Sequence, residues 1–188
     1  MNIIEEAKDL LENRGLKRTL EKYGSILPTG SFALDLMTWR DLDLYLMSDN
    51  LSSTDFFKLG ADINDLLNPV KMSFRNEILA KTDGQPNGLY WGVYLGNERK
   101  GAWKIDLWCV SKVEALTRHR FCEDLGKKLN SENRSVIHDL KSRCWENKYY
   151  RKEFYSTDIY DAVLKNDIFS FDKLKDFINS KYKKQLIR

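Results

Sequence analysis

The sequence has few of the residues that usually hold metals or cross-link small domains. Among its 188 residues are only three cysteines and two histidines. Cys109, Cys122 and Cys144 lie far apart without Cys-x-x-Cys spacing, which argues against both a zinc site and a disulfide framework. His119 and His138 have no second histidine or carboxylate at ligand spacing. The cysteines are therefore expected to be free thiols in a reducing compartment.

The chain also lacks long apolar runs and a strong excess of charge. No run approaches the roughly 20 apolar residues that span a bilayer, and acidic residues stand where a signal peptide needs a basic start. We therefore expect a cytoplasmic protein with no membrane partner. The net charge of +3 is too small to indicate a general nucleic-acid binder, because extended phosphate contact needs a concentrated basic face.

The composition, 42% hydrophobic with 12% aromatic residues, is that of a packed globular protein. Strand-like segments such as "VKMSFRNEIL" and "GLYWGVYL" follow earlier helical patterns, and the chain after residue 110 has helical spacing, including a half-exposed helix at "RCWENKYYRKEF". These patterns predict an α+β fold with a mixed sheet of about five strands. We expect an α/β core over 1–115 and a helical region over 116–188 packed on it. The oligomeric state stays open, a dimer included.

The most specific pattern lies between residues 29 and 47. Gly30 and Ser31 are followed, after nine intervening residues, by the Asp-x-Asp pair Asp41 and Asp43, within a segment that has the pattern of a strand. Because side chains alternate along a strand, the two carboxylates share one face and lie roughly 6.5 Å apart. That spacing suits two divalent cations, about 3.5 to 4 Å apart, that bridge a nucleotide's phosphates. The alternative is a solvated strand edge.

A later segment, "GAWKIDLWCV", contains a third carboxylate. Alternation along this strand places Lys104, Asp106 and Trp108 on one face and apolar residues on the other. A lone carboxylate in a central strand is costly to bury without a partner or a metal. Two interpretations stay open. Asp106 joins Asp41 and Asp43 in one metal site, or it pairs with Lys104 or an arginine at a sheet edge.

The Gly-Ser turn followed by an Asp-x-Asp strand resembles the signature of the nucleotidyltransferase fold, the polymerase-beta-like superfamily, over roughly residues 20 to 110. The resemblance implies that Gly30 and Ser31 bind a nucleoside triphosphate, with ATP as the first choice. Arg40 is assigned as a further nucleotide contact, with Lys104 and Arg99 as other sources of positive charge. The implied ligands of two Mg²⁺ ions, and the implied catalytic residues, are Asp41, Asp43 and Asp106.

The resemblance implies an enzyme that moves a nucleoside monophosphate to a hydroxyl of a small molecule, antibiotic-like or a metabolite, and releases pyrophosphate. A small acceptor is favoured over nucleic acid because the chain has no separate basic domain. Glu77 and Glu98 are candidate general bases. One alternative is a non-catalytic nucleotide- or partner-binding module, because many members have a glycine where this chain has Asp35. Another is an enzyme that modifies RNA ends or proteins.

Overall fold

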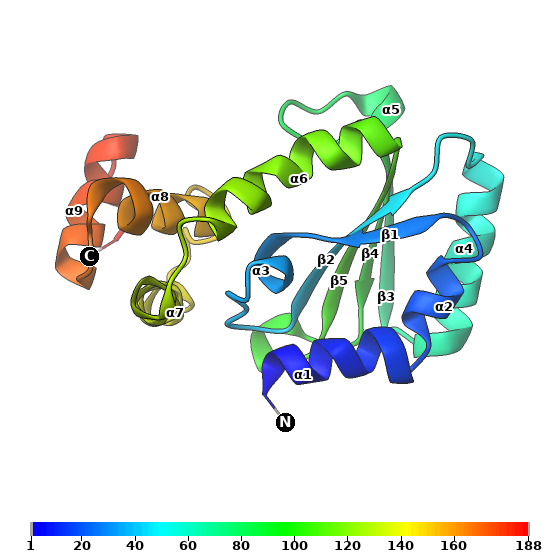
Figure 1. Cartoon of the computed structure of the whole chain (residues 1–188), viewed down its shortest axis with the longest axis horizontal. Helices are drawn as coiled ribbons and strands as arrows, with labels where there is room; N and C mark the ends of the chain where they lie inside the picture. Colours follow the sequence, from blue (N-terminus) through cyan, green and yellow to red (C-terminus); the bar gives the residue numbers. More distant parts are fainter. Residues whose placement is uncertain (1, 188) are drawn as a thin grey trace. The chain divides into compact units, whose positions relative to one another are not determined.

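The structure, a computed structural model, describes residues 2–187, and the chain divides into two compact units, Met1–Asp124 and Leu125–Arg188. The strands of the first unit are β1 (Ser25–Pro28), β2 (Asp41–Met47), β3 (Lys71–Asn76), β4 (Gly88–Tyr94) and β5 (Lys104–Val110). They form one sheet in the order β1-β2-β5-β4-β3 (Figure 1). β2 and β5 are parallel, whereas the other neighbours are antiparallel. The predicted α+β fold with a mixed sheet is confirmed.

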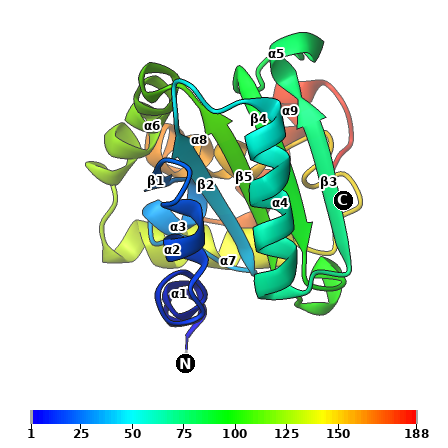
Figure 2. The ribbon, with the colours of Figure 1, turned by 90° about the vertical axis from the view of Figure 1, so that its right-hand side faces the viewer.

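One face of this sheet is apolar and carries the main core. Leu42, Leu44 and Leu46 of β2 point to this face and are fully buried, as alternation along the strand predicts. They pack against apolar side chains of the N-terminal helices and of α4. Figure 2 shows the helix α4 lying along the sheet. The elements on this face are α1 (Ile3–Lys8), the π-helical turn η1 (Asp9–Asn13), α2 (Leu16–Leu20) and α4 (Ser53–Leu67).

The ends of α4 are set by local side-chain chemistry. The Ser52 hydroxyl accepts a hydrogen bond from the backbone N–H of Asp55 at 3.1 Å and donates to its carboxylate at 2.7 Å. This arrangement satisfies one of the backbone donors that a helix start leaves without a partner. At the other end Asn68 adopts the left-handed conformation, with φ 47°, directly before Pro69. The Ser52 cap and the left-handed Asn68 thus delimit α4.

The opposite face of the sheet is mixed in character. One end carries a small apolar cluster of Tyr45, Tyr90, Trp108, Val110 and Ala115. Ala115 belongs to α6 (Lys112–Gly126), so this helix covers the end of the face that follows the candidate carboxylates along β2 and β5. The rest of this face carries polar side chains and is described below.

Three features of the described chain differ from or complete the predictions. β3 ends at Asn76 instead of continuing through residue 79, because the Asn76 side chain accepts a hydrogen bond from Leu79 N–H at 3.3 Å and begins the short helix α5 (Glu77–Ala80). All three cysteines are free, as predicted, and the structure shows that they are also buried. Within residues 2–187, no helix combines the length and the apolar character that crossing a membrane requires.

The second unit is helical, as predicted for this region. Its helices are α7 (Ser131–Cys144), α8 (Ser156–Asn166) and α9 (Phe171–Tyr182). The helix expected at 143–154 is wrong, because α7 ends at Cys144 and the following residues form turns in which Tyr150 and Phe154 are completely buried. Two buried aromatic side chains so close together hold the chain in this compact turn. Packing of this region on the core stays a prediction.

The contact between α4 and the sheet yields a test of the fold. A β-carbon at Gly60 would lie 2.8 Å from the buried indole ring of Trp91, whose Nε1 donates to the carbonyl of Phe56 at 3.0 Å. Gly60→Ala should therefore destabilise the protein by about 1 kcal/mol or more, because overpacking costs more than the roughly 1 kcal/mol gained from helix propensity. Urea unfolding followed by circular dichroism measures this change.

Gly126 provides the matched control for this substitution. It ends α6, and a β-carbon there would meet no atom within 4 Å. Gly126→Ala should leave the free energy of unfolding unchanged or raise it. If Gly60→Ala stabilises the protein as much as Gly126→Ala does, the close packing of α4 on Trp91 is contradicted.

Candidate functional site

The candidate carboxylates lie on two neighbouring parallel strands. Asp43 of β2 faces Asp106 of β5 in register, and Asp41 faces Lys104 in the same way. Register partners in a sheet project from the same face. These four residues therefore form one group, called here the acidic patch. β5 lies between β2 and β4, so Asp106 is in the interior of the sheet and not at an edge.

Lys104 connects two of the carboxylates within the acidic patch. Its Nζ lies 2.6 Å from Oδ2 of Asp106 and 3.6 Å from Oδ1 of Asp41. The Lys104 side chain is 12% exposed, and those of Asp41 and Asp106 are each 16% exposed. Asp106 is thus next to Asp43 and is also paired with Lys104, and its part in a metal site stays a prediction.

The Gly-Ser turn lies against Asp43. β1 leads into the turn, where the Thr29 N–H donates to the carbonyl of Asp43 at 3.0 Å. Gly30 then begins the short helix α3 (Gly30–Ala33) with a left-handed φ of 61°. A β-carbon at Gly30 would collide with the carboxylate of Asp43. Both the conformation and the close approach thus require glycine here.

Tyr90 of β4 holds Asp106, a contact that sequence reasoning missed. The Tyr90 hydroxyl donates a short hydrogen bond to Oδ1 of Asp106. Gly92, which faces Asp106 in register, makes room for it, because a β-carbon there would collide with the Tyr90 hydroxyl. Burial, followed by the charge of Asp106, raises the pKa of Tyr90 far above its ordinary value, so the hydroxyl stays protonated. Alternation predicts that Tyr90 and Gly92 share a face, but not which strand lies beside them.

Whether the patch fits a divalent cation can be judged from its donors. Three carboxylates are the hard oxygen ligands that Mg²⁺ prefers. Within the part of the chain that the structure describes, however, no three Asp, Glu, His or Cys side chains are placed ready to hold a metal ion. The Lys104 ammonium lies between two of the three donors. The residues fit the ion in type and number, and Lys104 has to withdraw before Asp41 and Asp106 can share it.

Comparisons with known proteins identify the fold. No protein-family model and no curated protein matches the chain, but solved structures do. A cytoplasmic RNA terminal U-transferase matches 86% of this chain with a TM-score of 0.58 and 14% identity. The Cid1 poly(U) polymerase with Mg and 3'-dATP bound also matches over 86%, with a TM-score of 0.59 and 13% identity. The chain has the nucleotidyltransferase fold. It spans 47% and 48% of the length of these two proteins.

This nucleotidyltransferase fold confirms the architecture that the Gly-Ser and Asp-x-Asp pattern implied. The structure also shows the backbone conformation at Asp35, the position at which the sequence pattern led us to expect a glycine. Asp35 has a left-handed φ of 55°, a conformation that glycine adopts freely and that Asp tolerates better than most residues. The side chain of Asp35 is exposed. Asp35 follows the C-terminal end of α3, whereas Gly30 begins this helix. The backbone conformation therefore explains why a glycine is suited to this position.

Arg40 is held by contacts outside the acidic patch. Its guanidinium donates to both carboxylate oxygens of Glu6, at 2.6 and 2.8 Å, and to the carbonyl of Gly101 at 3.2 Å. The hydrogen bond from Arg40 lowers the pKa of Glu6, so this ion pair is maintained at neutral pH. Although Arg40 precedes Asp41 in the chain, these bonds attach it to α1. Its assignment as a nucleotide contact stays a prediction.

The two candidate bases lie in separate segments. Glu77 begins α5, is 4% exposed, and accepts a hydrogen bond from Thr82 N–H at 3.1 Å. Hydrogen bonding by the Thr82 side chain, and then by this N–H, lowers the pKa of Glu77. Glu98 lies in the short helix η2 (Glu98–Lys100), together with Arg99. The Thr82 contact holds residues 77–82 together, and Nη1 of Arg75 on β3 lies 3.7 Å from Oε1 of Glu77. A role as general base stays a prediction for both.

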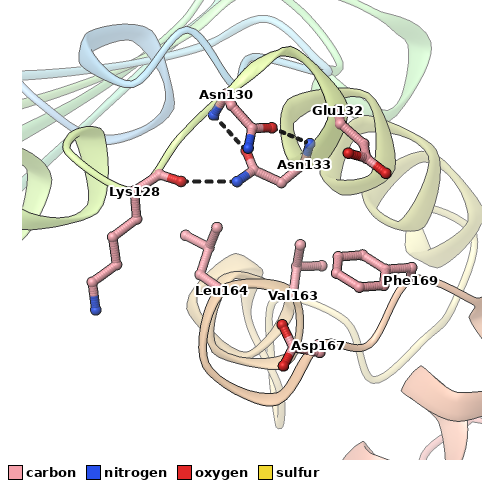
Figure 3. A pocket seen from close by; sticks show the side chains of 8 residues that line it. All are labelled: Lys128, Asn130, Glu132, Asn133, Val163, Leu164, Asp167 and Phe169. Carbon is pink, nitrogen blue, oxygen red and sulfur yellow. Dashed lines mark hydrogen bonds between the residues drawn. The ribbon is translucent and has the colours of Figure 1, made fainter.

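Two hollows lie away from the acidic patch. One, of about 300 Å³, is lined by residues 77 and 81–87. The other, of about 250 Å³, lies in the second unit between the start of α7 and the end of α8 (Figure 3). Its amide groups are already used, because Asn130 and Asn133 cap α7 reciprocally and Asn133 also donates to the Lys128 carbonyl at 2.8 Å. These amides therefore serve the helix start.

The contact between Gly30 and Asp43 can be tested through stability. Gly30→Ala should destabilise the protein by more than Gly84→Ala does. Both glycines have positive φ, so both substitutions cost about 1–2 kcal/mol of backbone strain. A β-carbon at Gly84 would meet nothing within 4 Å, so the excess at Gly30 reports the collision with Asp43, about 1–3 kcal/mol. Urea unfolding of both variants measures the difference.

A double-mutant cycle assigns this excess to the carboxylate. Asp43→Ala removes the oxygen atoms that the new β-carbon would meet. The free energy of unfolding of the Gly30→Ala, Asp43→Ala double variant should then exceed the additive expectation by on the order of 1 kcal/mol. Strict additivity, or equal losses for Gly30→Ala and Gly84→Ala, would contradict the close approach of the Gly-Ser turn to Asp43.

Proposed function

We propose that this protein is a Mg²⁺-dependent nucleotidyltransferase that transfers a nucleoside monophosphate from a nucleoside triphosphate to a hydroxyl of a small molecule and releases pyrophosphate. The observation that supports the proposal is the pairing of Asp43 with Asp106 on one face of the sheet, with Asp41 on the same strand and Gly30 against Asp43. Carboxylates grouped in this way can bind the cations on which triphosphate chemistry depends.

Each residue of the site has a distinct task in this proposal. Asp41 and Asp43 would hold the cations together with the triphosphate. Asp106, which the Tyr90 hydroxyl orients, would hold the cation that activates the acceptor hydroxyl. Gly30, which already lets the backbone come close to the carboxylate of Asp43, would let it approach the departing phosphates in the same way. When bound, Mg²⁺ would neutralise phosphate charge and lower the pKa of the acceptor hydroxyl.

The proposed acceptor is small, and ATP is the first nucleotide to test. The net charge of +3 offers little attraction to a long polyanion, whose binding depends on many phosphate contacts. The matched solved proteins are an RNA terminal U-transferase and a poly(U) polymerase. At 13–14% identity they support the fold without identifying the acceptor of this chain. RNA is therefore tested as an acceptor beside the small molecules.

Asparagine substitutions separate binding from catalysis. Asp43→Asn should weaken Mg²⁺-dependent nucleotide binding and turnover together, because it removes charge that holds the triphosphate's cations. Asp106→Asn should leave nucleotide affinity within a few-fold while turnover falls by about 10²-fold or more, as expected when an interaction acts chiefly in the transition state. Calorimetry with a nucleoside triphosphate, paired with pyrophosphate release over a panel of hydroxylated small molecules, measures both effects.

Asp62→Asn is the matched control. Asp62 lies on α4, on the opposite face of the sheet, where its carboxylate accepts from the Tyr23 hydroxyl at 3.1 Å. This variant should retain wild-type affinity and turnover. Equal activity of wild type and Asp106→Asn on a genuine acceptor contradicts the role of Asp106. Activity on RNA alone contradicts the small acceptor, and an absence of Mg²⁺-linked nucleotide binding favours the non-catalytic module.

A further inference from the structure

A lysine lies at the position in the acidic patch where the proposed function requires a cation. The Lys104 ammonium contacts Oδ2 of Asp106 at 2.6 Å and Oδ1 of Asp41 at 3.6 Å. This position follows from the strand pairing, because Lys104 faces Asp41 in register and precedes Asp106 by two residues on β5. The ammonium and a cation bound by both aspartates would therefore occupy the same space.

The two oxygens of Asp106 have different partners, and this determines which side chain moves. Oδ1 accepts from the hydroxyl of Tyr90, which is 6% exposed, whereas Oδ2 accepts from Lys104. The Tyr90 ring is packed against Trp108, so it keeps Asp106 oriented while Oδ2 changes its partner. Lys104 has a flexible four-carbon stem. It can withdraw without any rearrangement of the strands.

Withdrawal of Lys104 has a cost unless a new anion is present. A largely enclosed ammonium without a counter-ion is unfavourable. The ring of Tyr94, 6.0 Å from Nζ, offers a contact that is weaker than an ion pair. A triphosphate bound next to Gly30 would bring the missing negative charge to the same face of the sheet. The cost of releasing the two aspartates is then offset by a phosphate contact.

Given the proposed function, on which this step rests, we propose that Lys104 couples cation binding to nucleotide binding. Without nucleotide, Lys104 pairs with Asp41 and Asp106 and excludes a divalent cation from them. With nucleotide, Lys104 leaves both carboxylates and binds a phosphate. Because Lys104 competes with the cation in the nucleotide-free protein and contacts a phosphate in the complex, it weakens binding of the cation alone and strengthens binding of the cation and nucleotide together. The coupling between the two ligands is reciprocal.

The test measures Mn²⁺ and nucleotide binding without any turnover. Free Mn²⁺ is followed by electron paramagnetic resonance, first with nucleotide-free protein. The affinity for the Mn²⁺ complex of α,β-methylene-ATP, which cannot release pyrophosphate, is then measured by calorimetry. Lys104→Met should raise the Mn²⁺ affinity of nucleotide-free protein by about tenfold or more and should weaken binding of the Mn²⁺–nucleotide complex by a similar factor, within the usual range of coupling.

Lys71→Met is the matched control. Lys71 of β3 faces Tyr94 in register, and its Nζ lies 5.0 Å from the same ring that Lys104 approaches. Lys71 thus contacts the Tyr94 ring. The ion pairs with Asp41 and Asp106 are made by Lys104. Removing this charge should leave the Mn²⁺ affinity of nucleotide-free protein within a few-fold of wild type. A general effect of lost positive charge would change both variants equally.

Lys104→Gln is the second variant, because it keeps a hydrogen-bond donor if methionine disturbs folding. It should also gain Mn²⁺ affinity in the absence of nucleotide. Equal Mn²⁺ affinities for wild type, Lys104→Met and Lys104→Gln overturn the coupling role, and the proposed function stands if wild type still binds the Mn²⁺–nucleotide complex. If wild type and all variants fail to bind that complex, the proposed function is overturned and the coupling role with it.

Discussion

The site depends on the parallel pairing of β2 with β5. This pairing places Asp43 opposite Asp106 and Asp41 opposite Lys104. It is held in register by the other face of the same strands, where buried leucines such as Leu44 pack in the main core. A slip of one residue would move every side chain to the opposite face. The hydrophobic burial that stabilises the fold therefore also fixes the spacing of the acidic patch.

Glycines make room for the polar contacts at this patch. Gly30 allows the turn to approach the carboxylate of Asp43, and Gly92 allows the Tyr90 hydroxyl to reach Asp106. Lys104 supplies the positive charge that stabilises two of three neighbouring carboxylates, because like charges this close would otherwise raise the energy of the ionised state. An ammonium thus lies among the carboxylates that we propose as cation ligands, and the proposed coupling of metal and nucleotide binding rests on this contact.

Local signals predicted well wherever local chemistry decides the structure. Alternation along β2 and β5 correctly separated polar from apolar side chains. The predictions were wrong at two places. At β3, the Asn76 cap overrode a strand pattern, and after α7, burial of Tyr150 and Phe154 replaced a helix with turns. A single side-chain cap and long-range burial leave little trace in hydrophobic periodicity.

The sequence by itself determined the fold class, the Gly-Ser turn and the common face of Asp41 and Asp43, because these follow from composition and from the two-residue period of a strand. It left open whether Asp106 joins those carboxylates or pairs with Lys104. Only the tertiary structure decided that Asp106 lies next to Asp43 and pairs with Lys104, and that Tyr90 holds it. The physical reason is that strand order and register are set by non-local packing of the apolar face, which brings together residues more than sixty positions apart in the chain.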